Sequence, residues 1–348
     1  MTQRILIWGA GAVGAPVGAA LLRAGHFVTF VDMDAAHVAA MRDPERGLVI
    51  SGPEFSFSGA VDALTPDEVA GDWPVILLCV KAHHTRQAAE MLAPHLDANG
   101  CLVTLQNGLV ARVAADVLGG ERVLPGFINF GADRHESGHV AFGNRGTVAI
   151  GEMEGGTSAR LDALWQLLKT FEPDAIRADD IWAYLWGKLA YASLLFAQAV
   201  GEGGIAATLD RPELTPLWRA LAGETLAVAR TEGVTALGFA GFDPAAFAPD
   251  ADPAAAVASI AAVADFNRAS AKTHSGVWRD LAIHRRQTEA DAQLGMVVEI
   301  GARHGIACPA LSALIAMIHA IERGERAQHD DNLTELTAMI EPVYAAAD

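Results

Sequence analysis

The stretch RILIWGAGAVGAPVGAALL, residues 4–22, joins a short apolar run, three spaced glycines and a helix-like segment. The glycines are Gly9, Gly11 and Gly14, which is the G-x-G-x-x-G spacing. In such a loop the first glycine permits a tight turn, the second lets a pyrophosphate approach the backbone, and the third allows close helix–strand packing. The helix start then offers N–H groups to the phosphates. Strand, loop and helix in this order predict a dinucleotide-binding site.

The same stretch has two alternative interpretations. A basic residue before a short apolar run is typical of a secretory signal peptide, and Arg4 precedes such a run. A glycine-rich turn without a ligand is the other alternative. Because the glycines interrupt the run at functional spacing and a second strand-like segment, HFVTFVD at 26–32, follows at once, the pattern favours nucleotide binding.

Asp32 ends this second strand 23 positions after Gly9, where an acid binds the hydroxyls of the adenosine ribose. Its carboxylate would repel a 2′-phosphate, and VDMDAAHV at 31–38 has no Arg or Lys to reverse that. We therefore expect NAD(H) to be the favoured cofactor, with NADP(H) as the alternative. A plain strand-ending aspartate is the simpler interpretation of the same residue.

The pattern of the chain changes near residue 180. Strands are predicted at 4–8, 26–32, 75–80, 101–108, 122–134, 139–144 and 146–152. Helices alternate with them, which is typical of a parallel sheet covered on both sides. Beyond that point the predicted elements are alanine-rich helices, at 181–200, 213–232, 252–287, 288–304, 309–323 and 331–346. We expect an α/β Rossmann domain over 1–180 and an all-helical domain over 181–348.

Composition excludes several classes of partner. The 348 residues are 51% hydrophobic and carry a net charge of −17, so a globular protein with an acidic surface is expected. Such a surface repels nucleic acid and anionic lipid, and we expect neither as a partner. The cysteines Cys79, Cys101 and Cys308 lack disulfide or metal spacing, which predicts buried thiols in the cytoplasm.

Lys188 is the one charge in the segment IWAYLWGKLAYASLLFAQAV, residues 181–200. The segment is long enough to span a bilayer, but a lysine near its centre favours a buried helix. An unpaired buried ammonium is costly, so Lys188 either extends to water or is retained for a function. Taken alone, the segment favours the first of these.

Ordered motifs along nearly the whole chain resemble the ketopantoate reductase family. They are GAGAVG at 9–14, LCVKAHHT at 78–85, LQNGL at 105–109, LWGKLAYAS at 185–193 and RRQTEADAQLG at 285–295. The resemblance implies a Rossmann domain joined to a helical domain similar to that of 6-phosphogluconate dehydrogenase, with catalysis in the cleft between them. It also implies reduction of the 2-keto group of ketopantoate with a nicotinamide cofactor.

The resemblance also assigns roles to single residues. Lys188 matches the catalytic lysine, and Glu289 matches a glutamate that hydrogen-bonds in the active site. Lys81 matches a lysine that contacts cofactor or substrate, and Asn107 matches an asparagine near nicotinamide and substrate. Ser275 matches a carboxylate-binding serine. Without the resemblance, Lys81 would be a strand-end charge, Asn107 a turn residue and Glu289 part of a solvated helix face.

This sequence departs from the family pattern in three places. Ala192 and Phe196 stand where the family has asparagines, so a more apolar substrate is expected. The spacing from Asp280 to Glu289 is one residue longer than usual, which leaves the register of Ser275 open.

Two histidine pairs raise the question of a metal. His83 and His84 are adjacent and their side chains are expected to diverge, while His135 and His139 lack a third ligand nearby. We expect no metal site.

The chemistry explains why a lysine is suited to this position. Hydride addition to a carbonyl builds negative charge on oxygen, and a positioned ammonium stabilises that charge by giving a proton. In the reverse direction a neutral lysine is the base. The expected function is that of a homodimeric reductase of 2-keto acids or dehydrogenase of 2-hydroxy acids, acting on a small molecule. A related β-hydroxy acid dehydrogenase and a non-catalytic dinucleotide sensor are the alternatives.

Overall fold

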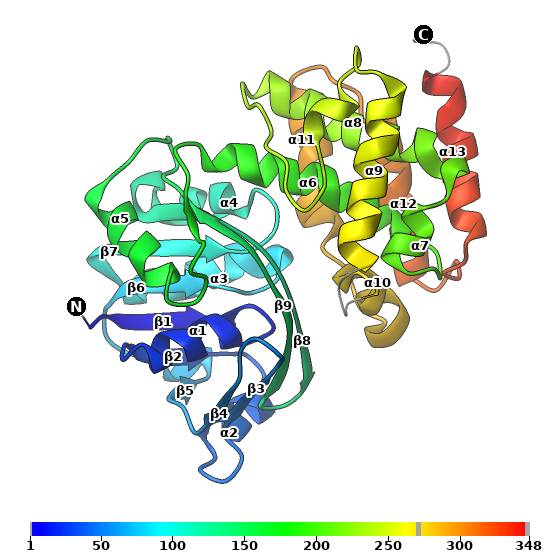
Figure 1. The fold of residues 1–348 in the computed structure, drawn as a ribbon. Coiled ribbons are helices and arrows are strands. Elements are labelled where there is room, and N and C mark those ends of the chain that lie inside the picture. Colours follow the sequence, from blue (N-terminus) through cyan, green and yellow to red (C-terminus); the bar gives the residue numbers. More distant parts are fainter. Residues whose placement is uncertain (1, 269–272, 345–348) are drawn as a thin grey trace. The chain divides into compact units, whose positions relative to one another are not determined.

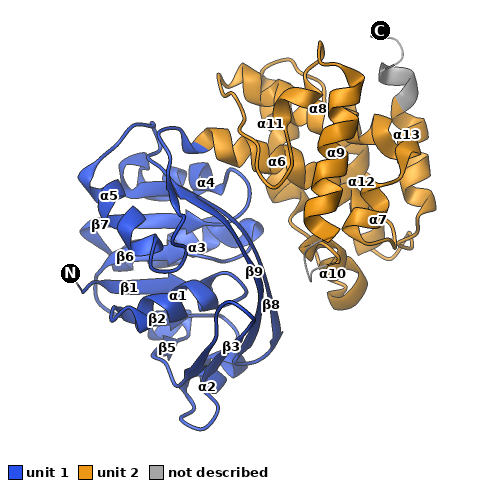
Figure 2. Ribbon diagram, viewed as in Figure 1, with its two compact units in different colours: residues 1–181 blue, residues 182–348 orange. Residues whose placement is uncertain are grey.

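The computed structural model describes residues 2–268 and 273–344 (Figure 1). The chain divides into two compact units, Met1–Ile181 and Trp182–Asp348 (Figure 2). Unit 1 is an α/β structure and unit 2 is helical, so the fold class predicted from the sequence is confirmed.

Among the described residues, unit 1 contains one ten-stranded sheet. Its strands are β1 (Arg4–Trp8), β2 (Phe27–Val31), β3 (Leu48–Ser51), β4 (Phe57–Gly59), β5 (Ala63–Leu64), β6 (Trp73–Leu78), β7 (Leu96–Leu105), β8 (Val123–Glu136), β9 (His139–Ile150) and β10 (Ile176–Arg177). They follow the order β4-β3-β9-β8-β7-β6-β1-β2-β5, with β10 beside β9. The neighbours β7, β6, β1 and β2 are all parallel, so their carboxyl ends meet at one edge.

The helices of unit 1 bury the sheet. They are α1 (Gly14–Arg23), α2 (Ala35–Arg42), α3 (Thr85–Leu92), α4 (Val110–Leu118) and α5 (Ala159–Leu168). Ile5 and Ile7 of β1 point into a core that includes buried residues of α1 and α5. The intervening Leu6 and Trp8 are also buried, which explains why the strand reads as a continuous apolar run.

The hairpin of β8 and β9 differs from the prediction. We expected separate strands at 139–144 and 146–152, but β9 is continuous and pairs antiparallel with β8. A Cβ at Gly146 would collide with the carbonyl oxygen of Asn129 on β8. The glycine therefore allows a close approach of two strands, whereas the sequence pattern suggested a turn.

Unit 2 is built from helices. They are α6 (Ile181–Gln198), α7 (Ile205–Leu209), α8 (Thr215–Thr231), α9 (Pro253–Arg268), α10 (Gly276–Arg279), α11 (Met296–Arg303), α12 (Pro309–Glu322) and α13 (Asp331–Tyr344), with π-helical turns at Asp280–His284 and Asp291–Gly295. The predicted helix 252–287 is interrupted, and its residues 269–272, like the last two of the predicted helix 331–346, lie outside the described residues.

Helix α6 is buried over most of its length, with Trp186 among the largest fully buried side chains. No helix in the described part of the chain combines the length and apolar character that a bilayer span requires.

Helix α12 begins at Pro309 without a side-chain cap from its N-cap residue, Cys308. Glu224 of α8 supplies the acceptors instead. Its Oε1 and Oε2 accept from the backbone N–H groups of Ala310 and Leu311, both at 2.8 Å. Because Glu224 is only 5% exposed, its charge is stabilised by these donors and by the positive end of the helix dipole.

Replacing Glu224 by Gln should therefore destabilise the protein. The amide would turn a donor toward one of two buried N–H groups, and we expect the free energy of unfolding to fall by about 1–3 kcal/mol. Urea denaturation measures this. The control is Glu325→Gln, which removes half of an exposed ion pair with Arg323 and should cost at most about 0.5 kcal/mol. Equal losses in both variants would contradict the capping role.

Candidate functional site

In the loop between β1 and α1, each of the three glycines is explained by a different feature of its surroundings. Gly9 has φ of 103°, and a Cβ there would lie 2.8 Å from the backbone nitrogen of Val80. A Cβ at Gly14 would collide with the carbonyl oxygen of Gly9 and the side chain of Ile7. At Gly11, in contrast, nothing lies within 4 Å of the added atom. The fold itself requires Gly9 and Gly14, while Gly11 leaves a space that a ligand can use.

The loop ends where α1 can receive a phosphate. Val13 occupies the N-cap of α1 and forms no side-chain cap hydrogen bond. Within this first turn the N–H of Ala15 donates to the carbonyl of Gly11 at 3.0 Å and Pro16 has no N–H, so the positive end of the helix dipole is what favours an anion here. Together with the open space at Gly11, this arrangement fits the pyrophosphate of a dinucleotide.

Asp32 shapes the loop as well as the edge of the sheet. Its Oδ2 accepts from the N–H of Ala10 at 3.0 Å, and its Oδ1 accepts from the N–H of Asp34 at 3.0 Å. Carboxylate oxygens have about four lone-pair positions between them, so acceptors remain for the hydroxyls of a ribose. The side chain is half-buried at the carboxyl end of β2.

His37 was not selected from the sequence, yet it is fully buried against the same loop. Its Nε2 lies 2.9 Å from the carbonyl oxygen of Ala10, and its Nδ1 lies 2.8 Å from the backbone nitrogen of Gly138. Since Gly138 can only donate, Nδ1 is the acceptor and Nε2 carries the hydrogen. Nothing local in the sequence distinguishes this histidine, because one partner is 101 residues away.

A cation also lies beside this edge, contrary to what the local sequence suggested. Arg134 of β8 places Nη1 3.1 Å from Oδ2 of Asp34. Partial burial raises the pKa of Asp34, but hydrogen bonds from the N–H groups of His37 and Ala36 and the charge of Arg134 outweigh it and lower the pKa. Residues 31–38 contain no Arg or Lys, so this cation comes from a distant part of the chain.

Lys81 and Asn107 follow β6 and β7, so they lie at the same edge of the sheet as Asp32. Lys81 is half-buried, and Asn107 is exposed in the turn before Gly108. Gln106 ties the two strand ends together, since its Nε2 donates to the carbonyl of Val80 at 2.7 Å and to Thr85 Oγ1 at 2.9 Å. No sequence pattern indicated this role for Gln106, although the residue stands directly before Asn107.

Lys188 lies on α6 over two aromatic rings. Its Nζ is 5.9 Å from the ring centroid of Tyr191 and 5.6 Å from that of Phe239. The chain bearing Phe239 packs closely on α6, because Leu237 donates its N–H to the carbonyl of Ala183 at 2.9 Å and a Cβ at Gly187 would collide with the carbonyl oxygen of Leu237. Lys188 is half-buried.

Tyr191 is itself buried within unit 2. Its ring meets Phe239 and Phe242 edge-on, and its hydroxyl accepts from Asn267 Nδ2 at 3.3 Å. Burial raises the pKa of Tyr191, and the hydrogen bond from Asn267 only partly offsets this. These contacts show packing inside the helical unit.

The two positions that depart from the family pattern are both buried. Ala192 is 7% exposed and Phe196 is 1% exposed. An asparagine at either position would need polar partners, whereas the apolar residues add to the packing of α6.

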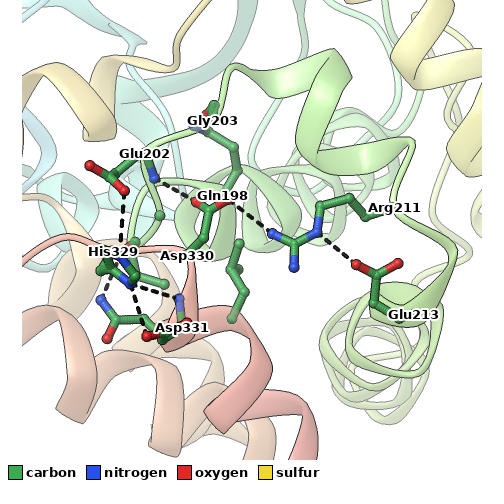
Figure 3. A network of polar contacts seen from close by, with 12 residues as sticks. Gln198, Glu202, Gly203, Arg211, Glu213, His329, Asp330 and Asp331 are labelled. Atoms are coloured by element: carbon green, nitrogen blue, oxygen red, sulfur yellow. Dashed lines mark hydrogen bonds and ion pairs between the residues drawn. The ribbon is translucent and has the colours of Figure 1, made fainter.

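The loop that follows α6 is fixed by hydrogen bonds from three directions (Figure 3). Gln198 Nε2 donates to the carbonyl of Gly203 at 2.6 Å, and the N–H of Glu202 donates to Oδ1 of Asp330 at 2.9 Å. Arg211 Nη1 lies 3.1 Å from the other oxygen of Asp330. This network anchors the carboxyl end of α6 to the start of α13, which limits the movement of the helix that carries Lys188.

Ser275 and Glu289 flank an irregular stretch. Ser275 is buried, and its Oγ accepts from the N–H of Trp278 at 3.1 Å as the N-cap of α10. Glu289 is half-buried directly before α11 and its π-helical turn. The π-helical turn Asp280–His284 and Arg285, with φ of 47°, lie between them. A π-helical turn holds one more residue than an α-helical turn, which gives a physical account of the longer spacing.

The structure places both the histidine residues considered as metal ligands and the cysteines. His83 and His84 do not diverge as we expected, because their Nε2 atoms lie 3.1 Å apart. Even so, among residues 2–268 and 273–344 no three His, Cys, Asp or Glu side chains are grouped to hold a metal ion. The free cysteines are buried, and burial raises the pKa of all three thiols, which makes them poor nucleophiles: Cys79, Cys101 and Cys308.

The geometry of the glycine loop predicts that two glycine substitutions both weaken nucleotide binding but differ in their effect on stability. Gly11→Ala should fold with the stability of the natural protein, because its Cβ meets open space, but should weaken nucleotide binding about tenfold or more. Gly14→Ala should lose both stability and binding. Thermal unfolding without ligand and titration with reduced nucleotide measure the two effects. Unimpaired binding by a folded Gly11→Ala protein would exclude the loop as the phosphate site.

Comparison with known proteins agrees with this geometry. The family model for ketopantoate reductase PanE/ApbA matches residues 5–155, and the model for its C-terminal part matches 180–322. The 2-dehydropantoate 2-reductase of Archaeoglobus fulgidus is 27% identical, covering 92% of this chain and 99% of the relative.

Solved structures show the same similarity. A PanE/ApbA family ketopantoate reductase from Ralstonia eutropha JMP134 has a TM-score of 0.77 at 26% identity, covering 92% of this chain and 99% of that one. A D-mandelate dehydrogenase solved with NADH and anilino(oxo)acetate has a TM-score of 0.80 at 20% identity and the same coverage, which shows a shared fold. The chain belongs to the ketopantoate reductase family and is an NAD(P)-dependent oxidoreductase.

Proposed function

We propose that this protein transfers hydride between a nicotinamide and a small 2-keto or 2-hydroxy acid, with Lys188 as the general acid or base. The observation that carries the proposal is the position of Lys188, whose ammonium lies over Tyr191 and Phe239 on a helix, Ile181–Gln198, that has no other charged side chain. The family relatives are 2-dehydropantoate 2-reductases, so 2-dehydropantoate or a more apolar analogue is the proposed substrate.

The proposed mechanism assigns a physical task to each group. A bound nicotinamide supplies or accepts the hydride. Lys188 gives its proton to the substrate oxygen as negative charge develops there, and in the reverse direction the neutral amine takes the proton. The rings of Tyr191 and Phe239 hold the ammonium in one place, which is worth about 1–2 kcal/mol for a partly desolvated cation. Glu289 is proposed as a hydrogen-bonding partner at the site, and Ser275 as a contact of the substrate carboxylate.

We further propose that residues 1–180 bind the cofactor and that residues 181–348 bind substrate and form a homodimer. Gly9, Gly11 and Gly14 would hold the pyrophosphate, Asp32 the ribose, and Lys81 and Asn107 the remainder of the cofactor, with Asn107 also near the substrate. NADH is the proposed preference, because Asp32 presents a carboxylate where NADPH carries a phosphate.

Two variants test the role of Lys188. Lys188→Ala should reduce turnover by a factor of about 10² or more while the affinity for reduced nucleotide stays within threefold, because a proton donor acts only in the transition state. The matched control is Lys169→Ala in unit 1, another half-buried lysine, whose Nζ lies 4.9 Å from the ring of Trp165. It should leave turnover unchanged.

The assay follows reduced nicotinamide absorbance with a panel of branched and aromatic 2-keto acids, 2-hydroxy acids and β-hydroxy acids. Turnover with β-hydroxy acids alone would favour a β-hydroxy acid dehydrogenase. Tight nucleotide binding without turnover on any member of the panel would indicate a dinucleotide sensor. Unchanged turnover in Lys188→Ala would refute the proposed general acid.

Cofactor choice is tested at Asp32. Asp32→Asn removes the charge but keeps one acceptor for the backbone, so it should raise the ratio of kcat/KM for NADPH to that for NADH about tenfold. Asp32→Ala removes the acceptors of both Ala10 and Asp34 and should weaken binding of both nucleotides. Steady-state kinetics with each nucleotide gives the ratios. If the natural protein already uses NADPH better than NADH, the argument from Asp32 is wrong.

A further inference from the structure

The carboxyl end of β2 carries more charge than Asp32 alone. The next acid, Asp34, forms an ion pair with Arg134 at 3.1 Å, and the two residues are 100 positions apart in sequence. The backbone N–H of Asp34 is bound in turn to Oδ1 of Asp32 at 3.0 Å. Asp34 therefore links the guanidinium of Arg134 to Asp32, the acid proposed to bind the ribose.

The position of this guanidinium matters for nucleotide choice. In Rossmann domains an acid at the end of the second strand binds the ribose 2′-hydroxyl, and an arginine near it accommodates a 2′-phosphate. Here both kinds of group are present, from separate parts of the chain. Asp34 and Arg134 have side chains 37% and 36% exposed, so a ligand can reach them.

The backbone holds both members of the pair. Asp34 is the N-cap of α2, and its Oδ1 accepts from the N–H groups of Ala36 and His37, which directs Oδ2 to the arginine. Arg134 lies on β8, and the turn that follows this strand is tied to His37 by the hydrogen bond from Gly138. The pair is thus fixed by a helix start on one side and by a hairpin on the other.

The acidic side chains around Arg134 would disfavour a phosphate at this arginine. Two carboxylates, of Asp32 and Asp34, stand against one guanidinium, so the local sum is negative. A phosphate dianion would be repelled by both acids, and it would have to compete with Asp34 for the same donors.

We propose that Asp34 sets nucleotide selectivity by engaging Arg134, a guanidinium at this edge that could otherwise bind the 2′-phosphate of NADPH. The inference rests on the proposed function in one respect, the NADH preference. It goes beyond that function by assigning nucleotide specificity to the Asp34–Arg134 pair in addition to Asp32.

The test uses equilibrium binding of NADH and NADPH, followed by nucleotide fluorescence, so that no substrate is needed. Asp34→Asn removes the charge and keeps the acceptor that caps α2. We expect its dissociation constant for NADPH to fall about tenfold, with that for NADH within threefold of the natural protein. Asp34→Ser, which retains a good N-cap residue, should act in the same direction. In Asp34→Asn combined with Arg134→Gln, the gain for NADPH should disappear.

The control is Arg177→Gln, because Arg177 has the same 36% side-chain exposure and pairs with Asp162 elsewhere in unit 1. It should change neither dissociation constant. The proposal is overturned if both folded Asp34 variants keep the NADPH to NADH ratio within threefold of the natural protein, or if the gain persists without Arg134.

Failure of the proposed function gives a different result from failure of this inference. Absence of keto acid turnover leaves the binding measurements unaffected. A natural protein that binds NADPH more tightly than NADH would refute the proposed preference, while the change caused by removing Asp34 would still decide the role of the pair.

Discussion

The organisation of the edge proposed to bind nucleotide depends on how one peptide unit is held, that of Ala10 in the glycine loop. Its N–H donates to Asp32, which follows β2, and its carbonyl accepts from His37 in the first turn of α2. The loop is therefore held from two sides. Backbone groups left without partners in a buried position cost about 1–3 kcal/mol each, which makes the two contacts decisive for the shape of the loop.

The same contacts connect this edge to a distant part of unit 1. His37 accepts from Gly138 in the β8–β9 turn, and Arg134 on β8 reaches Asp34. The long hairpin therefore supports the nucleotide edge in addition to extending the sheet. Asp32, Asp34 and His37 each carry a structural task, so substitutions there need variants that separate stability from affinity.

In unit 2 the apolar helices hold their few charged groups through specific partners. Glu224 accepts two N–H groups at the start of α12, and buried Asp280 pairs with Arg286 at 2.7 Å. Lys188 lies over the aromatic faces of Tyr191 and Phe239, which stabilise a nearby ammonium.

Local patterns in the sequence determined the fold class and much of the nucleotide edge. The glycine spacing, the apolar strands and the acid at the end of β2 act over a few residues, so they can be recognised without a structure. The roles expected for Lys188, Glu289 and Ser275 came from the family resemblance, because no local pattern indicates them. Tertiary structure alone decided which distant groups meet: His37 with Gly138, Arg134 with Asp34, and Glu224 with Ala310. These partners lie 86 to 101 positions apart, and a hydrogen bond or ion pair at that separation leaves no periodic signal in the chain, because only folding brings its two ends together.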